Sequence, residues 1–215
     1  KFGFIDKTGK VVIPLIYDRC DDFEDGLAYV ELNDKCGFID MTGKVVIPLI
    51  YDICDDFEDG LCRVRLKGKS GFIDMTGKVV ISLIYDFCSS FQEGLTCVGL
   101  NGKYGFIDMT GKVVIPLIYD SCFGYFMDGL SCVRLKGKYG FIDRTGKVVI
   151  PLIYDGCDGF KEDLCCVYLN GKSGFIDRIG KVVIPLINDF YCGYFRKGLC
   201  RFKLKGKRGF IDKTG

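Results

Sequence analysis

Short apolar runs recur along the whole chain, and polar clusters rich in Gly, Asp and Asn separate them. Val, Ile, Phe and Tyr dominate these runs, as in Val11–Tyr17. β-branched and aromatic residues bounded by turn residues are typical of strands, and no stretch keeps a helical apolar period beyond one turn. The pattern therefore predicts an all-β chain.

The same pattern returns at a fixed interval. The tetrapeptide Gly-Phe-Ile-Asp occurs seven times, 34 or 35 residues apart. It begins at Gly3, Gly37, Gly71, Gly105, Gly140, Gly174 and Gly209. Six units and a partial seventh predict a single repeat array over residues 1–215, in which each unit packs on the next. Because the chain begins and ends inside the motif, we expect it to be a fragment of a longer chain.

Each unit is predicted to be an antiparallel meander. In the second unit the strands are expected at Gly37–Asp40, Lys44–Ile47 and Leu61–Leu66. The segment Asp6–Lys10 and its equivalents read as a type I turn closed by a left-handed Gly. The five prolines share one column, and because proline cannot donate to a ladder, each predicts a kink, a bulge or an exposed edge.

The strand that begins at Leu61 carries two different sets of side chains. At three alternate positions the first set has a small residue, then a branched one, then Leu, as in Cys62, Val64 and Leu66. A buried face of fixed volume requires side chains of constant size at each position. The other set follows no steric rule from unit to unit, so we interpret it as solvent-facing and as the candidate partner-binding face. Its members are Tyr29, Arg63, Arg65, Arg134, Tyr168, Arg201 and Lys203.

Two phenylalanine columns keep their size in every unit. They contain Phe4, Phe38, Phe72, Phe106, Phe141, Phe175 and Phe210, and Phe23, Phe57, Phe91, Phe126, Phe160 and Phe195. An aromatic stripe is a stacking platform in some proteins. A stripe of constant size is more typical of packing between repeats, which is the interpretation we favour.

The chain has 13 cysteines and no histidine. One cysteine follows the Tyr-Asp motif or its equivalent in each unit. We interpret the cysteines as small core residues with free thiols, which favours a reducing, cytoplasmic location. The alternative is a disulfide within each unit, such as Cys54 with Cys62. The acidic stretch Asp21–Asp25 is read as a solvated loop rather than a calcium site, because the third unit has Ser89 and Ser90 there.

Charge and chemistry exclude several function classes. There are 30 Lys and Arg against 28 Asp and Glu, a net charge of +2, so the basic excess of a nucleic-acid or membrane-surface protein is missing. Without histidine no Ser-His or Cys-His pair can form, and the cysteines show no C-x-x-C spacing for zinc. We expect no catalytic, cofactor-binding or metal-binding residues, and we therefore expect that the protein is not an enzyme.

The unit resembles the bacterial WG (or KWG) repeat family. The residues that carry the resemblance are Lys103–Asp108, then the segment to Tyr119-Asp120, and then Phe126–Val133. The name-giving Trp is absent from every unit, and its column contains Phe2, Cys36, Ser70, Tyr104, Tyr139, Ser173 and Arg208. The resemblance implies a repetitive, non-catalytic β module.

Two closures of the array are compatible with the repeat. An open, superhelical solenoid of 34–35-residue meanders is preferred, and a six-bladed β-propeller is the alternative. The predicted function is a scaffold that presents a variable β surface to another macromolecule, a protein rather than nucleic acid or membrane. A structural spacer within a larger protein is the second hypothesis.

Overall fold

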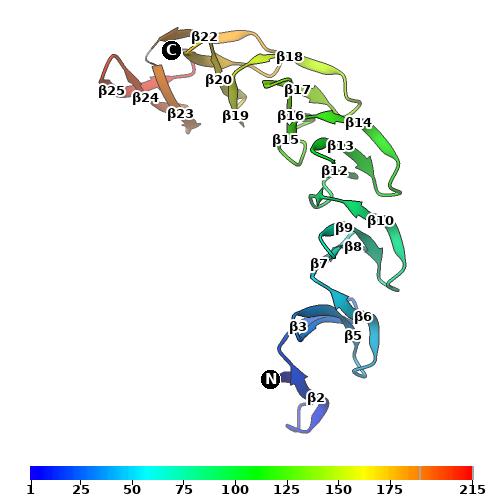
Figure 1. Cartoon of the computed structure of the whole chain (residues 1–215). Coiled ribbons are helices and arrows are strands. Elements are labelled where there is room, and N and C mark those ends of the chain that lie inside the picture. The colour runs from blue at the N-terminus through cyan, green and yellow to red at the C-terminus, as the bar shows by residue number, and fades with distance from the viewer. Residues whose placement is uncertain (189, 215) are drawn as a thin grey trace. The chain divides into compact units, whose positions relative to one another are not determined.

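The computed structural model in Figure 1 describes residues 1–188 and 190–214. Every regular element in this part of the chain is a β-strand, and consecutive strands pair as antiparallel meanders. The predicted all-β meander repeat is therefore confirmed. The preference for an open array over a propeller stays a prediction.

Seven sheets follow one another in the described residues. The first three contain β1 (Phe2–Ile5) and β2 (Val11–Tyr17); β3 (Arg19–Glu24), β4 (Leu27–Leu32), β5 (Lys35–Asp40) and β6 (Val45–Tyr51); and β7 (Ile53–Glu58), β8 (Leu61–Leu66), β9 (Lys69–Asp74) and β10 (Val79–Tyr85). The next two contain β11 (Phe87–Cys88), β12 (Leu95–Leu100), β13 (Lys103–Asp108) and β14 (Val113–Tyr119); and β15 (Ser121–Cys122), β16 (Leu130–Leu135), β17 (Lys138–Asp143) and β18 (Val148–Tyr154). The last two contain β19 (Gly156–Lys161), β20 (Leu164–Leu169), β21 (Lys172–Ile176) and β22 (Val182–Asn188); and β23 (Phe190–Arg196), β24 (Leu199–Leu204) and β25 (Lys207–Asp212).

The strands belong to two compact units. The first comprises residues 1–94, 98–101 and 108–112, and the second comprises residues 95–97, 102–107 and 113–215. Every described sheet after the first begins just after a Tyr-Asp motif or its equivalent, not at Gly-Phe-Ile-Asp. The sheets therefore recur at the same interval as the sequence repeat, but a sheet starts after Tyr-Asp, whereas the sequence unit is counted from Gly-Phe-Ile-Asp.

The turn between the third and fourth strands of each sheet has the predicted geometry. In the turn from Asp40 to Lys44, Gly43 has a φ of +83°, and its N–H donates to the carbonyl oxygen of Asp40 over 2.9 Å. The Asp40 carboxylate accepts hydrogen bonds from the backbone N–H of Thr42 at 2.9 Å and of Lys44 at 3.0 Å. The aspartate after Ile is thus a turn residue.

The proline column lies in a bulge on an edge strand. β6 is the last strand of its sheet, and its register against β5 shifts between Cys36↔Tyr51 and Phe38↔Ile47, across Pro48. The bulge brings the chain so close to Gly37 that a Cβ there would overlap the carbonyl oxygens of Ile47 and Pro48. Only glycine fits this position, which explains why Gly begins the motif.

One strand of each full meander was missed by sequence reasoning. Asp21–Asp25 was expected to form a loop, but Asp21–Glu24 belong to β3, which pairs with β4. The acidic residues hid the strand, because carboxylates are depleted from strands in general and are tolerated on an edge that faces solvent. The four-residue stretch Val-Val-Ile-Pro and the following Leu-Ile-Tyr form one strand rather than two, as β6 shows.

Consecutive sheets pack face to face. In the first unit, Ile47 and Tyr51 of β6 form one buried cluster with Cys62 and Val64 of β8. In the second unit, Ile115 and Tyr119 of β14 do the same with Val133 of β16. The two Phe columns meet across each of these interfaces, with ring centroids 5.1 Å apart for Phe38 and Phe57 and 4.8 Å apart for Phe106 and Phe126. The interpretation of these columns as packing between repeats is confirmed.

Candidate functional site

The predicted partner-binding face lies largely between sheets. Tyr29, Arg63, Arg134 and Tyr168 are half-buried, whereas Arg65, Arg201 and Lys203 are exposed. In the same column as Arg63, the side chains of Cys97, Cys132 and Cys166 are buried. Internal sheets are covered on both faces, so the interpretation of this set as solvent-facing is wrong for its half-buried members. Whether any of the seven residues binds a partner stays a prediction.

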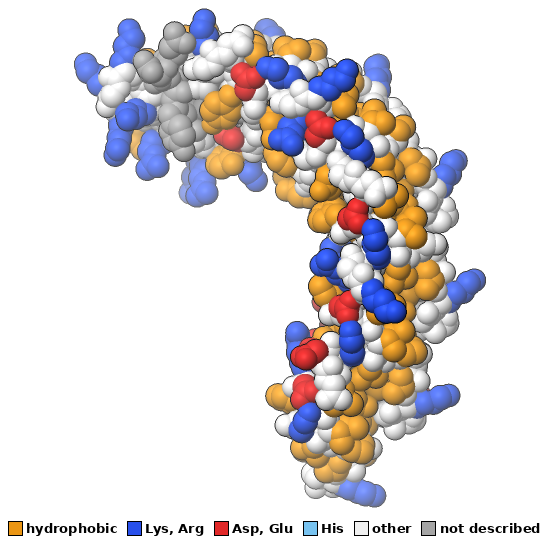
Figure 2. Space-filling view, viewed as in Figure 1, with side chains coloured by type: hydrophobic (Ala, Val, Ile, Leu, Met, Phe, Trp, Pro, Cys, Tyr) orange, Lys and Arg blue, Asp and Glu red, His pale blue; other side chains and the backbone are white. Residues whose placement is uncertain are grey.

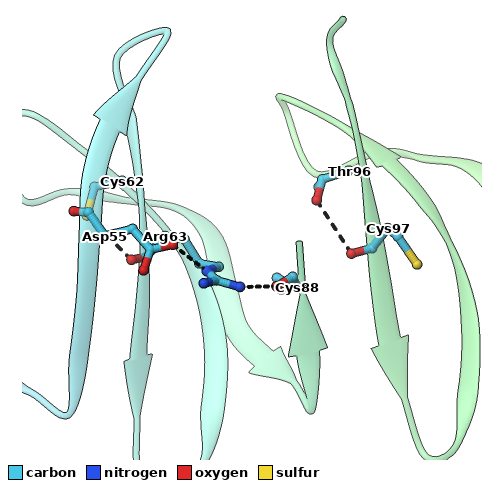
Figure 3. Close-up of polar contacts among 6 residues, drawn as sticks. All are labelled: Asp55, Cys62, Arg63, Cys88, Thr96 and Cys97. Atoms are coloured by element: carbon cyan, nitrogen blue, oxygen red, sulfur yellow. Dashed lines mark hydrogen bonds and ion pairs between the residues drawn. The ribbon is translucent and has the colours of Figure 1, made fainter. Parts of the chain in front are cut away.

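Arg63 shows how one of these residues is used inside the molecule. Its Nε donates to a carboxylate oxygen of Asp55 at 2.7 Å, and its Nη1 donates to the carbonyl oxygen of Cys88 on β11. Figure 3 shows the guanidinium between these two groups, with the Cys62 thiol beside Asp55. Arg63 therefore links the sheet β7–β10 to the strand that follows it, and its charge is neutralised by Asp55.

The tyrosines of the predicted face also have partners within the chain. The Tyr29 hydroxyl donates to Glu31 at 3.1 Å, and the guanidinium of Arg19 lies 5.2 Å from the centre of its ring. Burial, together with the hydrogen bond to Glu31, raises the pKa of Tyr29 to about 12. The Tyr168 hydroxyl donates to Asp158 at 3.0 Å. The hydroxyls of both tyrosines are thus occupied by carboxylates of the chain itself.

The interpretation of all thirteen cysteines as free thiols is wrong. Disulfides join Cys36 to Cys54 and Cys97 to Cys122, and Cys166 is disulfide-bonded as well. The alternative of a bridge within each unit is also wrong for Cys54, whose partner lies on the preceding sheet, while Cys62 is free. The core interpretation holds for the small column, in which Cys62, Cys165 and Cys200 are buried free thiols.

These disulfides change what the sequence implies about location. Structural disulfides persist in oxidising compartments and are rare in the cytosol. The free-thiol premise for a cytoplasmic location is therefore removed. Sequence spacing does not give the pairing, because the two bonded cysteines are 18 residues apart in Cys36–Cys54 and 25 residues apart in Cys97–Cys122.

The aspartate of the Tyr-Asp motif ties one sheet to the next. Asp52 forms an ion pair with Lys35, and its other carboxylate oxygen accepts the backbone N–H of Lys67 in the β8–β9 turn at 2.6 Å. In the same way, Asp86 forms an ion pair with Lys69 at 2.6 Å and accepts a hydrogen bond from the backbone N–H of Asn101 at 2.7 Å. Figure 2 shows Lys and Arg side chains next to Asp and Glu side chains on the face in view, beside apolar ones. The ion pair with Lys35 lowers the pKa of Asp52, and that with Lys69 lowers the pKa of Asp86.

Clefts open between the first strands of neighbouring sheets. A cleft of about 460 Å³ in the first unit is lined by Asp21, Asp22, Glu24, Asp25 and Asp56, with Tyr29 and Phe57 at its base. A cleft of about 220 Å³ in the second unit is lined by Phe123, Tyr125, Met127, Cys132 and Tyr194. Equivalent positions thus carry acidic side chains in one place and aromatic ones in another.

The last strand of each four-stranded sheet exposes apolar side chains. Roughly half of the side-chain surface of Ile50 and Ile84 is accessible, at 47% and 49%. Two columns of this strand are exposed throughout the described sheets: the Val at its start and the Ile just before the Tyr-Asp motif or its equivalent. They comprise Val11, Val45, Val79, Val113, Val148 and Val182, and Ile16, Ile50, Ile84, Ile118, Ile153 and Ile187. We name these two columns the apolar edge. Sequence analysis assigned these runs to strands but not to the surface.

Two further observations bear on the chemistry of the described residues. In the part of the chain that the structure describes, no three Cys, Asp or Glu side chains gather as metal ligands would. No helix there is long and apolar enough to cross a membrane.

Comparison with known families decides what this repeat is. The family described as WG containing repeat matches residues 2–36, 37–69, 71–104, 104–139, 139–172 and 174–207. The chain belongs to the WG containing repeat family. The resemblance seen in the sequence is thereby confirmed, and this WG repeat array lacks Trp altogether.

Three solved structures are distantly similar to this WG repeat chain, and no curated protein matches it. Two crystal structures of the extracellular domain of BT4673 from B. thetaiotaomicron are similar at 11% identity, with TM-scores of 0.37 and 0.38. The matches cover 97% and 90% of this chain, and the chain spans about a third of theirs, 35% and 34%. The AfRom2 CNH domain is similar at 10% identity with a TM-score of 0.32, over 95% of this chain and 82% of that one.

Proposed function

We propose that this WG repeat array is a non-catalytic scaffold that binds another protein through its apolar edge. The supporting observation is the repetition of exposed Val and Ile at equivalent positions of successive sheets. Roughly half of the surface of residues such as Ile50 and Ile84 stays accessible, so burial within the chain does not by itself account for apolar residues at these positions. Contiguous exposed apolar surface is uncommon on monomers and is typical of protein interaction sites.

The proline column favours side-chain contacts over strand addition. Pro48 lies on the edge strand β6 and has no N–H to offer an incoming strand. A partner that docks here therefore meets the exposed side chains of Val45 and Ile50 rather than an open ladder of hydrogen bonds.

A structural spacer is the rival function. A spacer needs only folded repeats, so its exposed columns are free to become polar, and a polar edge is the better protected one. The persistence of Val and Ile on the edge favours binding.

Affinity capture with an edge variant tests the proposal. The variant carries Val45→Thr, Ile50→Thr, Val79→Thr and Ile84→Thr, which keep β-branching or strand propensity while removing apolar surface. A control variant replaces four exposed polar side chains, Lys44, Arg65, Lys67 and Lys78, by Ser. Both variants are expected to keep the thermal midpoint of the wild type, because exposed substitutions change stability by about 0.5 kcal/mol or less each.

The partner is identified by mass spectrometry, and cross-links from Lys44 or Lys78 of the wild type locate it on the edge. We expect the edge variant to lose the partner and the control variant to keep it. Loss in the control variant alone would assign binding to the charged surface. Absence of any specific partner of the wild type would leave the spacer as the function.

A further inference from the structure

Sulfur atoms occupy equivalent places at successive sheet boundaries of the second compact unit. Cys97 on β12 is disulfide-bonded to Cys122 on β15. Cys132, at the matching position of β16, lies opposite Cys157 on β19, with 2.7 Å between the two Sγ atoms. Cys166, the next member of this column, is also disulfide-bonded. The second pair is thus flanked in the column by cysteines that are already oxidised.

We propose that Cys132 and Cys157 are a further disulfide site, which ties the sheet β15–β18 to the sheet β19–β22 when the protein meets a small-molecule disulfide. Both side chains are buried in one cluster with Phe141 and Phe160, so the two sheets already hold the sulfurs in contact. Their sequence separation of 25 residues equals that of Cys97 and Cys122. Formation of the bond therefore needs no new arrangement of the strands.

A third thiol, Cys165, competes for Cys157. The two thiols are hydrogen-bonded, and Cys165 lies on β20 of the same sheet as Cys157. The column of Cys165 contains Ala28, Thr96 and Ser131 in other units, so its role there is to fill a small buried space. The column of Cys132 contains the bridging Cys97 and Cys166. The repeat therefore selects Cys132 as the partner of Cys157.

The reaction is a thiol–disulfide exchange with an oxidant such as oxidised glutathione. Both cysteines are buried, with 4% of Cys132 and 9% of Cys157 exposed. Cys132 is the one of the two that lines the cleft of about 220 Å³, so an oxidant in this cleft meets its sulfur first. The Cys132 thiolate attacks one glutathione sulfur, forms a mixed disulfide and releases one reduced glutathione. The Cys157 thiolate then attacks the Cys132 sulfur and releases the second. Together, the two cysteine thiols lose two protons and two electrons, and the glutathione disulfide takes them up as its own S–S bond breaks to give two reduced glutathione molecules.

Loss of the Cys157 proton is unfavourable in the folded protein. The hydrogen bond with Cys132, followed by burial, raises the pKa of Cys157. The charged groups nearest to this pair include Asp158 and Lys161, which line the same cleft. Because the thiolate is the nucleophile, we expect oxidation to accelerate as the pH rises from 7 to 9.

Disulfide mapping of the whole chain tests the proposal. The protein is incubated with oxidised glutathione, alkylated in denaturant and cleaved without reduction. Cyanogen bromide cleaves after Met127, between Cys122 and Cys132, and trypsin cleaves after Lys161, between Cys157 and Cys165. Every candidate pairing then gives a different cross-linked mass.

The expected product joins the Cys132 peptide to the Cys157 peptide in most molecules, both in the wild type and in Cys165→Ser. Cys132→Ser should leave Cys157 alkylated or joined to Cys165, and should abolish the rise in thermal midpoint that oxidation gives the wild type. A Cys157–Cys165 cross-link in the wild type would overturn the proposal. So would alkylation of both Cys132 and Cys157 in molecules that keep the Cys97–Cys122 disulfide.

Discussion

The sheet β7–β10 and the sheet β23–β25 place the same residue types at equivalent positions, but only the first buries them on both faces. Phe72 on β9 has 2% of its surface exposed, whereas the equivalent Phe210 on β25 has 69%. Arg63 on β8 is half-buried and paired, whereas Arg201 on β24 is exposed. The difference shows that the Gly-Phe-Ile-Asp phenylalanine is buried by the sheet that follows, not by its own sheet.

The largest expected contrast is between the two phenylalanines. Phe72→Ala removes a buried ring that packs against the ring of Phe91, with 4.8 Å between the two ring centroids. The substitution should lower the free energy of unfolding by about 3–5 kcal/mol. Phe210→Ala removes an exposed ring and should cost less than about 0.5 kcal/mol. Urea titration of both variants measures the contrast, and equal losses would show that Phe210 is covered in solution.

The motif glycines should differ for a related reason. A Cβ on Gly71 would overlap the carbonyl oxygens of Ile81 and Ser82, which are backbone atoms fixed by the bulge. A Cβ on Gly209 would meet only the Phe202 ring, at 3.1 Å, and that ring can rotate away. We expect Gly71→Ala to destabilise by about 1–3 kcal/mol and Gly209→Ala by clearly less. Thermal unfolding followed by circular dichroism would show the two midpoints, and the reverse order would contradict the bulge geometry.

The arginines of these two sheets are expected to differ in how much they contribute to stability. The interpretation of Arg63, Arg65 and Arg134 as solvent-facing implies that Ser can replace all three with folding nearly intact. The ion pair with Asp55 and the bond to the Cys88 carbonyl now predict a loss of about 1.5 kcal/mol for Arg63→Ser, because Asp55 keeps its charge without a partner. Arg65→Ser and Arg201→Ser should each stay within about 0.5 kcal/mol. Equal effects of all three substitutions in urea titration would mean that the Arg63 contacts are absent in solution.

The smallest expected effect is the response to acid. The ion pair with Lys69 holds the pKa of Asp86 below its usual value of 3.8, so the folded state binds its proton less readily than the unfolded state. This contribution to stability is complete above pH 3.8 and is lost as the pH falls through the folded pKa. Asp86→Asn should therefore flatten the fall in thermal midpoint between about pH 5 and pH 2. An unchanged slope would show that Asp86 does not join the sheets in solution.

Much of the local structure followed from the sequence because turns are decided by neighbouring residues. Gly43 adopts the positive φ that the turn needs, and Asp40 accepts the hydrogen bonds expected of it. Leu61–Leu66 forms a strand with the expected bounds, because alternation along a strand is itself a local signal. The small column, represented by Cys62 and Thr96, is buried as predicted.

The candidate site was less predictable because it depends on what covers each strand. Alternation separates the two faces of β8 but does not say that a second sheet covers the face with Arg63. Figure 3 shows the contact that decides it, between Arg63 and β11. The exposure of Ile50 was likewise hidden, because an apolar run in a strand reads the same whether it is buried or lies on an edge.

The sequence by itself determined the repeat, the β class, the turns and the family, because each depends on residue types at short or periodic spacing. Only the tertiary structure decided which cysteines meet. Cys54 bonds to Cys36 rather than to Cys62 because strands from two sheets bring those sulfurs together. The same stacking places Phe72 in the core and leaves Phe210 in solvent, although both stand in one sequence motif. Burial here is a property of the interface between repeats, and a single repeat does not encode it.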